Sequence, residues 1–347
     1  MDHKNGRWML HAPNLHTGGG LTLLRLLVDA MPAQLRHIQC DARVRGKVDF
    51  PADVQVTYVA PTVWSRLCAE WRLRAMMHAE DGILCMHNLP PLFACKARAV
   101  VFVHNRLLVS DDSLEDYPWR TGLRLRVERL WLRTLSHHAA LFMVQTESMA
   151  SALRKTLGSA VPVEICPFAP VIEKTPHATS PAYDYIYPAA GDAHKNHATL
   201  LMAWQHLARS GITPSLVLTV DPLRYPELAQ EIEQLTREQG LNITNLGSLA
   251  PSEMAQLYQS ARALIFPSRT ESLGLPLLEA QSYGLPILAA ERDYVRDIVT
   301  PTETFDPDSA LSIARAVMRS EGRSMLTATM QGASEFWHGL FGFSNNR

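Results

Sequence analysis

Two glutamates, Glu271 and Glu279, stand in the segment PSRTESLGLPLLEAQSYGLP with seven residues between them. The preceding ALIFPS is typical of a strand and LPLLEAQSYG of a helix, with Pro276 suited to its first turn and Gly284 to its C-terminal cap. The start of such a helix carries unpaired N–H groups and a positive dipole end, which together bind phosphate well. Carboxylates accept hydrogen bonds from hydroxyl groups, as in ribose or a sugar. These groups together predict a nucleotide-sugar site.

The segment resembles the signature of retaining glycosyltransferases with the two-domain GT-B fold, the glycosyl transferases group 1 family. This family includes glycogen-synthase-like and lipopolysaccharide mannosyltransferase-like enzymes. The resemblance implies that Glu271 contacts the donor sugar, that Glu279 contacts the ribose, and that the backbone amides between them contact the diphosphate. The matching positions between the glutamates are Ser272, Leu273, Gly274 and Leu275. The alternative is a solvated helix whose glutamates only favour its N-terminal half.

A second matching segment, YPAAGDAHKNHATLLMAW, places Lys195 and Asn196 between a predicted strand and a predicted helix. It is similar to the family's turn whose lysine neutralises the leaving diphosphate, a role that suits an ammonium group; the alternative is a solvated lysine. The family usually carries an arginine about five residues earlier, where this chain has Ala190. The candidates to replace that cation are His194, His197 and Arg269.

Two N-terminal features also match the family. Gly18, Gly19 and Gly20 are predicted to form a turn between the first strand and the first helix. The resemblance implies that this turn lies near the donor phosphates and the acceptor, and the alternative is a tight turn without a ligand. The glycines do not spell the dinucleotide fingerprint, which disfavours a nicotinamide cofactor. His104 ends the strand-like VVFVHNR, and the resemblance implies a donor-sugar contact; a core histidine is the alternative.

Three other polar residues are candidates for a role at the site or beside it. His16 lies beside the glycines and could serve the acceptor. Asp306 and Asp308 form a D-x-D arrangement, which can hold a divalent metal through its oxygen ligands. Here the pair resembles a structural loop of the family. We therefore expect no catalytic metal and no cofactor other than the nucleotide-diphosphate sugar, which is a substrate.

The chain alternates between β-prone runs and helical patterns, which is typical of parallel α/β units. We expect strands within residues 7–13, 37–42, 54–60, 83–88, 98–105, 139–146, 183–191, 215–220, 242–247, 263–268 and 286–290. They predict two Rossmann-like doubly wound domains facing a central cleft. The predicted divisions are an acceptor domain (1–170), a linker (171–182), a donor domain (183–325) and a C-terminal helix packing back on the acceptor domain (326–347).

Composition limits the classes of partner. The 347 residues include 33 basic and 34 acidic side chains, so nothing global favours nucleic acid. The five cysteines form no C-x-x-C pair, which disfavours a zinc knuckle or a disulfide framework. Neither a signal peptide nor an apolar run of about 18 residues is evident. We therefore expect a cytoplasmic protein that touches a membrane only peripherally.

One segment, WRTGLRLRVERLWLRTLSHH at residues 119–138, is predicted to form a basic amphipathic helix. We expect its apolar stripe to cover the sheet, because a strand follows immediately. The basic face is then either solvated or directed to anionic lipid. The stripe comprises Leu123, Val127, Leu130, Trp131 and Leu135, and the arginines are Arg120, Arg124, Arg126, Arg129 and Arg133.

The sequence thus predicts a retaining, metal-independent hexosyltransferase in bacterial cell-surface polysaccharide biosynthesis. It would move a hexosyl group from a nucleotide-diphosphate sugar to a hydroxyl of a glycan or a lipid-linked acceptor. Lys195, Glu271 and His104 are the expected catalytic residues. Three alternatives remain: a glycosidase-like use of the carboxylate pair, a GT-B epimerase or phosphorylase, and a GT-B module that binds a nucleotide sugar or a partner without turnover.

Overall fold

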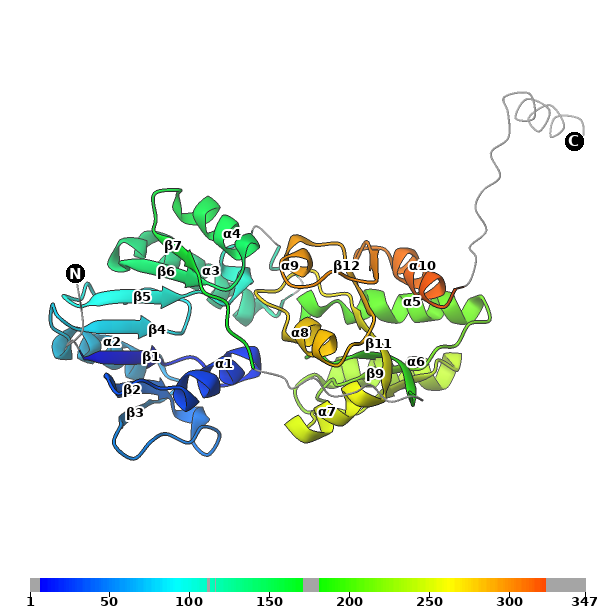
Figure 1. Cartoon of the computed structure of the whole chain (residues 1–347), viewed down its shortest axis with the longest axis horizontal. Helices are drawn as coiled ribbons and strands as arrows, with labels where there is room; N and C mark the ends of the chain where they lie inside the picture. Colours follow the sequence, from blue (N-terminus) through cyan, green and yellow to red (C-terminus); the bar gives the residue numbers. More distant parts are fainter. Residues whose placement is uncertain (1–6, 111–112, 116, 171–180, 323–347) are drawn as a thin grey trace, which may run out of the picture.

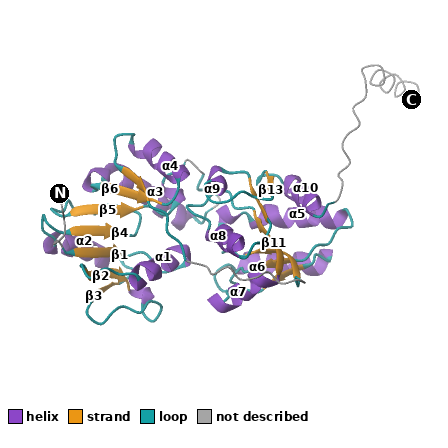
Figure 2. Cartoon of the chain, viewed as in Figure 1, coloured by secondary structure: helices purple, strands orange, loops and turns teal. Residues whose placement is uncertain are grey.

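The computed structural model describes residues 7–110, 113–115, 117–170 and 181–322. These residues form two lobes, each built on a parallel sheet (Figure 1). Helices flank the strands in both lobes (Figure 2). The predicted C-terminal helix (326–347) and most of the predicted linker (171–182) lie outside the described residues.

The N-terminal sheet has seven strands in the order β3-β2-β1-β4-β5-β6-β7. The strands are β1 (Trp8–Ala12), β2 (Leu35–Asp41), β3 (Gln55–Val59), β4 (Gly82–Cys85), β5 (Arg98–Phe102), β6 (Leu141–Val144) and β7 (Val163–Ile165). The helices are α1 (Gly18–Asp29), α2 (Val63–Met76), α3 (Trp119–Thr134) and α4 (Glu147–Leu157). Short 3-10 turns are η1 (Ala42–Val44), η2 (Arg106–Leu108) and η3 (Ser136–His138).

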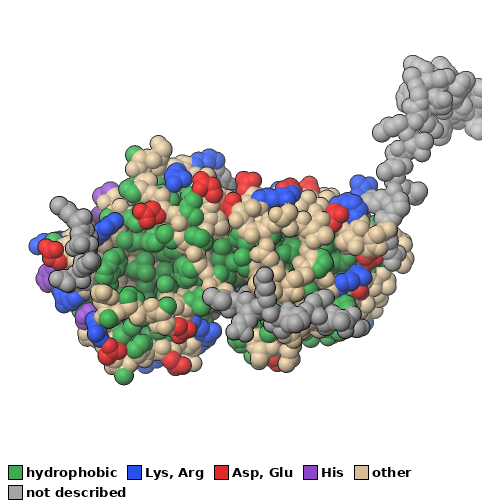
Figure 3. Space-filling model, viewed as in Figure 1, with side chains coloured by type: hydrophobic (Ala, Val, Ile, Leu, Met, Phe, Trp, Pro, Cys, Tyr) green, Lys and Arg blue, Asp and Glu red, His purple; other side chains and the backbone are tan. Residues whose placement is uncertain are grey.

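The two faces of this sheet are covered differently. Buried side chains of α2, α3 and α4 share one core cluster, whereas those of α1 belong to another. This division follows from topology: right-handed crossovers from β1 to β2 and from β3 onward to β4 leave the sheet on opposite faces. On the α1 side, hydrophobic side chains gather over the strands beside α1 (Figure 3), and Leu84 and Met143 are only partly buried there.

The C-terminal sheet has six strands in the order β10-β9-β8-β11-β12-β13. The strands are β8 (Tyr183–Tyr187), β9 (Leu216–Leu218), β10 (Ile243–Asn245), β11 (Ala261–Phe266), β12 (Ile287–Ala290) and β13 (Glu303–Phe305). The helices are α5 (His197–Arg209), α6 (Pro226–Gln239), α7 (Pro251–Ser260), α8 (Leu275–Ser282), α9 (Asp293–Arg296) and α10 (Ala310–Ser320), with the 3-10 turn η4 (Ala193–Lys195) before α5. Both sheets are parallel throughout, as expected for doubly wound domains.

The lobes meet at the carboxyl ends of their strands, where ligands of open parallel sheets bind. Tyr117 of the N-terminal lobe hydrogen-bonds through its hydroxyl with Nδ1 of His194 at 2.9 Å. At a second contact, the backbone N–H of Ser148 in α4 donates to Oδ2 of Asp297 at 2.9 Å. Figure 1 shows α4 beside α9 at this junction. The central cleft predicted from the sequence therefore lies between two contacting lobes.

Two predictions of local structure are wrong. The glycine triplet is not a turn before the first helix, because α1 begins at Gly18, whose φ is +62°, and its first turn contains Gly19 and Gly20. The predicted apolar stripe of α3 does not cover the sheet, since Leu123, Val127 and Leu130 are exposed. The helix instead packs through a neighbouring stripe, whose buried members are Gly122, Leu125 and Leu132.

Among the described residues, no helix combines the length and the apolar character that crossing a bilayer requires. Helix α3, which carries the exposed apolar stripe, has 16 residues, and several of them are arginines.

Candidate functional site

The centre of the candidate site is an ion pair between two strand-end loops. Lys195 follows β8 and Glu271 follows β11, and these strands are neighbours in the parallel sheet. Their carboxyl ends therefore lie at the same edge. Nζ of Lys195 is 2.5 Å from Oε1 of Glu271, and the two side chains are only 17% and 11% exposed. The structure thus joins two of the predicted catalytic residues directly.

Glu271 is held in its ionised form. Burial alone would raise the pKa of its carboxyl, but the charges of Lys195 and His194 and the hydrogen bonds from Lys195 and Ser268 hold that pKa below its ordinary value. The Ser268 hydroxyl donates to Oε1 at 2.7 Å. Glu271 is therefore a fixed acceptor at the mouth of the sheet, suited to a donor with several hydroxyl groups.

Two buried tyrosine hydroxyls donate hydrogen bonds to the backbone of the loops that carry Lys195 and Glu271. Tyr187 at the end of β8 donates to the carbonyl of Lys195 at 2.7 Å. Tyr294 of α9 donates to the carbonyl of Ser268 at 2.6 Å. Because both tyrosines are almost fully buried, their hydroxyls have no competing solvent, and the loops are positioned before any ligand binds.

Asn196 holds the same edge together. It adopts the left-handed conformation, with φ of 63°, and is buried. Its Nδ2 donates to the carbonyls of Pro267 and Pro307 at 3.1 and 2.7 Å, so it connects the ends of β8, β11 and β13. Thr199 donates to its Oδ1 at 2.7 Å. The backbone of Asn196 is bonded as well, because its N–H donates to the carbonyl of Ala193 at 3.1 Å and its carbonyl accepts from the N–H of Leu200 at 3.3 Å. Asn196 therefore shapes the loop that carries Lys195.

Helix α8 begins beside this ion pair. Gly274 precedes it with φ of +73°, a conformation that favours glycine, and proline lies in the first turn as predicted. A Cβ built on Gly19 would be 3.6 Å from Cδ1 of Leu275, so the start of α1 faces the start of α8 across the junction. The predicted phosphate-binding amides and the glycine triplet are thus brought together, and Ser272 and Leu273 lie in the same loop.

Glu279 lies on α8, one turn beyond its start. Its Oε2 accepts a hydrogen bond of 2.6 Å from the hydroxyl of Tyr258, and the Tyr258 ring stacks on Tyr283. Burial raises the pKa of the Glu279 carboxyl, although the bond from Tyr258 opposes that shift. Tyr258 therefore orients the carboxyl. Because burial disfavours its charged form, a ligand that donates hydrogen bonds to the carboxylate would stabilise it.

His104 lies at the end of β5, close to the first turn of α1. Its Nε2–H donates to the carbonyl of Met86 at 2.9 Å, and its ring stacks on Phe102. Burial lowers its pKa despite that hydrogen bond, so the ring is neutral near pH 7. A Cβ on Gly20 would be 3.1 Å from Cε1 of His104, which places the histidine beside the predicted glycine site.

The three candidates to replace the arginine absent at Ala190 differ in their charge and in their partners. His197 is buried, and burial together with the charges of Lys195 and His194 lowers its pKa to about 3, so it is neutral. Arg269 donates to Asp308 at 2.7 Å, which already balances its charge. His194 adjoins Lys195 and acts on the pKa of Glu271. His194 is therefore the best placed of the three.

Arginines bind Asp308, one member of the D-x-D arrangement. Arg269 and Arg292 each approach one of its oxygens at 2.7 Å. The hydrogen bond from Arg269 is the main reason that the pKa of Asp308 is lowered. Oδ1 of Asp306 accepts from the backbone N–H of Asp308 at 3.0 Å. The arrangement thus serves as a structural loop beside the site.

A groove of about 820 Å³ lies between the lobes. Its N-terminal wall comprises Arg106 and residues of α4, and its C-terminal wall runs from Arg269 and Thr270 to residues of α9. Thr270 adjoins Glu271 in sequence, so the groove reaches the loop that carries the ion pair. A second hollow, of about 620 Å³, lies between α6 and β10 and contains none of the predicted donor residues.

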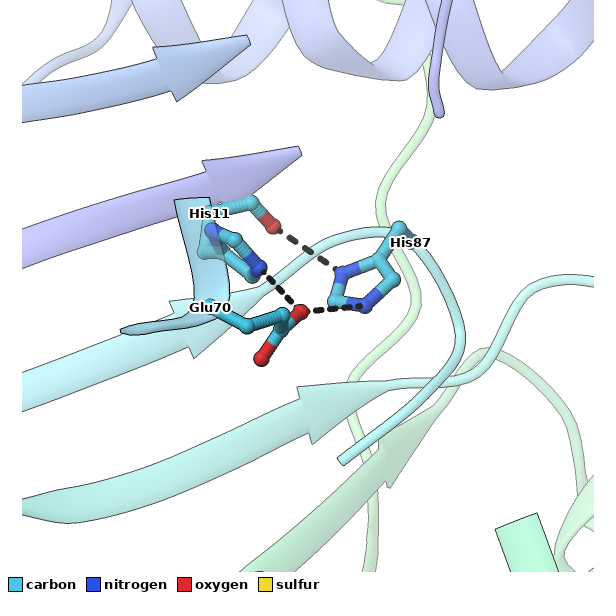
Figure 4. A group of neighbouring side chains, drawn as sticks. All are labelled: His11, Glu70 and His87. Carbon is cyan, nitrogen blue, oxygen red and sulfur yellow. Dashed lines mark hydrogen bonds and ion pairs between the residues drawn. The ribbon is translucent and has the colours of Figure 1, made fainter. Parts of the chain in front are cut away.

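Sequence reasoning missed a buried cluster of His11, Glu70 and His87 in the N-terminal lobe (Figure 4). Nε2 of His11 is 2.8 Å from Oε1 of Glu70, and Nε2 of His87 is 3.9 Å from the same oxygen. The first distance is that of a hydrogen bond, whereas two ligands on a tetrahedral zinc ion are about 3.3 Å apart, because each Zn–N or Zn–O bond is about 2.0–2.2 Å. These three groups could approach a metal only after rearrangement.

The cluster anchors α2 on the sheet. Glu70 of α2 accepts from His11 of β1 and, through Oε2, from the backbone N–H of Leu92 at 2.9 Å. Burial would raise the pKa of Glu70, but the charge and hydrogen bond of His11 hold it below its ordinary value. His11 lies near the end of β1, and His87 follows the neighbouring strand β4. Histidines at the ends of two predicted strands were the signal that could have located it.

We expect Glu70→Leu to lower the free energy of unfolding by about 3–5 kcal/mol, because it leaves His11 and the Leu92 N–H buried without their partner. Glu233→Leu is the matched control, since Glu233 is an exposed helical glutamate in an i,i+4 pair with Arg237; its effect should stay below about 1 kcal/mol. Urea unfolding measures both. Equal stability of the two variants would show that the cluster does not anchor α2.

Comparisons with known proteins show similarity to glycosyltransferases. Residues 173–323 match the family model of the glycosyl transferases group 1. The sulfoquinovosyl transferase SQD2 of Arabidopsis thaliana is 33% identical over 105 residues, which cover 27% of this chain and 20% of that protein. The serotype-specific mannosyltransferase WbdA of Escherichia coli is 30% identical over 149 residues, which cover 40% of this chain and 17% of that protein. The matches thus span a fifth or less of these relatives.

The fold likeness extends further than the sequence likeness. The crystal structure of Anabaena Alr3699/HepE in complex with UDP and glucose superposes with a TM-score of 0.69 at 14% identity. The superposition covers 91% of this chain and 90% of that one. The two lobes together therefore have the GT-B fold. Residues 173–323, which are less than half of the chain, are similar to the glycosyl transferases group 1 family.

Proposed function

We propose that this chain is a retaining glycosyltransferase that moves a hexosyl group from a nucleoside diphosphate sugar to a hydroxyl group. The observation that carries the proposal is the Lys195–Glu271 ion pair at the start of α8. A cation, a fixed carboxylate and the backbone N–H groups of the loop that leads into α8 are what a donor of diphosphate and sugar requires. The family match of residues 173–323 supports the same assignment.

The donor would lie along α8. Its diphosphate would bind the N–H groups at the start of the helix, where Gly274 leaves room for a close approach. The ribose hydroxyls would donate to Glu279, and the sugar hydroxyls to Glu271. The ammonium group of Lys195 would then bind the diphosphate and weaken its ion pair with Glu271. No step needs a metal, because the charge of the leaving group is met by the side chains and by the helix dipole.

The reaction follows from this placement. The acceptor oxygen forms a bond to the anomeric carbon on the face from which the diphosphate departs, so the configuration is retained. The bond from that carbon to the diphosphate oxygen breaks, and the electron pair leaves with the diphosphate. The acceptor's proton passes to a departing phosphate oxygen. Lys195 and the amides stabilise the charge that develops there, which is the main source of catalysis in such a site.

His194 would supply the second cation. It adjoins Lys195, and its ring is positioned by the hydroxyl of Tyr117 from the other lobe. It therefore takes the place of the arginine that is absent at Ala190. Because Tyr117 and His194 belong to different lobes, the charge at the diphosphate would depend on contact between the lobes.

The acceptor would approach through the groove between the lobes. Arg106, Arg269 and Arg292 border this groove, and it opens at the loop of Glu271. Arg269 and Arg292 already bind Asp308. Arg106, whose Nη1 donates to the Ser148 hydroxyl at 2.8 Å, would therefore be the arginine partner of a phosphate on a glycan or a lipid-linked sugar. Similarity to the O-antigen chain mannosyltransferase B of Escherichia coli, 31% identical over 94 residues, supports an acceptor of the bacterial surface-polysaccharide class.

Donor binding is tested by thermal unfolding of the purified chain with nucleoside diphosphates and nucleotide sugars, with and without EDTA. We expect one diphosphate to raise the midpoint at saturation, by the mass-action effect of a ligand on the folded state. The shift should survive EDTA and fall sharply in Glu279→Gln, but persist in the matched control Glu233→Gln, at an exposed helical glutamate. No shift with any nucleotide would contradict the proposed donor site.

Transfer is tested by the turnover of Lys195→Met with the nucleotide sugar that binds. We expect a loss of about a hundredfold or more, by analogy with the removal of one oxyanion-hole donor. Lys47→Met, at an exposed lysine of the N-terminal lobe, should keep normal turnover. Near-normal turnover of Lys195→Met would remove the lysine from the mechanism. Donor binding without transfer to any acceptor would favour a non-catalytic GT-B module.

A further inference from the structure

Exposed apolar side chains concentrate on two helices of the N-terminal lobe. Of the thirteen large apolar side chains that are exposed in the described residues, eight belong to α2 and α3. On α2 they are Val63, Trp64, Leu67 and Trp71; on α3 they are Trp119, Leu123, Val127 and Leu130. We name these eight residues the docking face. Trp64, Trp71 and Trp119 are 75%, 67% and 71% exposed, which is unusual for the largest apolar side chain.

The two helices present this face on one side of the lobe. Their buried residues share a core cluster on the sheet face opposite α1. They also hold the same loop, since Trp131 of α3 donates to the carbonyl of Pro90 and Glu70 of α2 accepts from Leu92. Burial lowers the pKa of Arg66 on α2, and the charges of Glu128 and Arg124 on α3 act on it as well. The helices are therefore neighbours.

The orientation of each helix is fixed by its inner face. On α2 the buried residues are Ala69, Glu70 and Leu73, and Glu70 is anchored by His11. Trp64 and Trp71 are seven residues apart and so share the outer face. On α3 the outer positions 119, 123, 127 and 130 follow the three- and four-residue spacing of one stripe. The apolar face of each helix is thus held outward by the packing of the other side.

Arginines surround the apolar stripe of α3. The helix contains five arginines and one glutamate, although the whole chain has a net charge of −1. At 100° per residue, Arg120 and Arg124 lie along one edge of the stripe, and Arg126 and Arg133 lie along the other. All four are exposed. The docking face thus has an apolar stripe between two rows of cations, and it includes tryptophans. This pattern is typical of a helix that lies in the interface of an anionic bilayer.

We propose that the docking face binds the surface of an anionic phospholipid bilayer. The apolar side chains would enter the headgroup region, and the guanidinium groups would bind lipid phosphates. The charge favours lipid over a second copy of the chain, because two such faces would bring their arginine rows together. This inference concerns where the protein binds and does not require the proposed transfer reaction.

The same placement brings the membrane close to the candidate site. α2 and α3 both begin at the edge of the sheet where the strands end, because each helix runs back toward the start of the next strand. Trp119 is two residues from Tyr117, whose hydroxyl reaches His194 beside Lys195. A lipid-linked acceptor in the bilayer would therefore enter next to the diphosphate site, and this step of the argument rests on the proposed function.

The test is co-sedimentation of the full chain with vesicles of phosphatidylcholine alone and of phosphatidylcholine mixed with phosphatidylglycerol, in the absence of nucleotide. We expect binding to the anionic vesicles only, with a blue shift of tryptophan fluorescence and a loss of binding at high salt. The combined variant Leu123→Ser, Val127→Ser, Leu130→Ser should weaken binding about tenfold or more. Because these side chains are exposed, the variant should fold.

The matched control is Met202→Ser, Leu223→Ser, Leu311→Ser, which removes three exposed apolar side chains of the C-terminal lobe. It should bind vesicles as the unmodified chain does. Three outcomes would overturn the proposal: no binding to anionic vesicles, equal binding by the two variants, or a dimer in solution that only the α3 variant abolishes. The thermal shift by a nucleoside diphosphate should be unchanged in both variants, so failure here would be distinguishable from failure of the donor site.

Discussion

The buried ion pair between Lys195 and Glu271 is the interaction on which the account of this site depends. Opposite charges removed from water stabilise each other only when the geometry is good and the remaining hydrogen bonds are satisfied. Here Ser268 provides an additional bond to the carboxylate, and tyrosine hydroxyls hold both loops. The pair therefore keeps a cation at the edge of the sheet, and under the proposed function a diphosphate would take the place of the carboxylate. A site prepared in this way needs little rearrangement when the reaction begins.

The rest of the fold positions this pair relative to the other lobe. Parallel strands direct all their carboxyl ends to one edge, and the two sheets meet there, so that the start of α1 faces the start of α8. Tyr117 and His194 connect the lobes beside the pair. The buried cluster around Glu70 lies in the N-terminal lobe, away from this pair. It fixes the orientation of α2 and hence determines which side chains α2 exposes. Polar groups inside the N-terminal lobe thus determine the surface it presents.

Most of the strands and the position of α8 could be predicted from the sequence. The longer β-prone runs were all strands, and the proline and glycine that bound α8 located it, because both residues have strong positional preferences in helices. The three-residue strands β7 and β13 were not predicted, although β9 and β10, which are equally short, were predicted within longer β-prone runs. The α3 prediction was wrong because two adjacent stripes of the helix are apolar, and spacing alone does not determine which one covers the sheet. The Lys195–Glu271 and His11–Glu70 pairs join residues far apart in the chain, which no local pattern indicates.

The most direct measurement of the central claim is a crystal structure of the chain with the nucleoside diphosphate that stabilises it. We expect a terminal phosphate within about 3.2 Å of Nζ of Lys195 and of the N–H groups at the start of α8, with the ribose hydroxyls on Glu279. Lys195 would have moved from Glu271 toward the phosphate. A diphosphate bound away from α8, with the Lys195–Glu271 pair intact, would contradict the account.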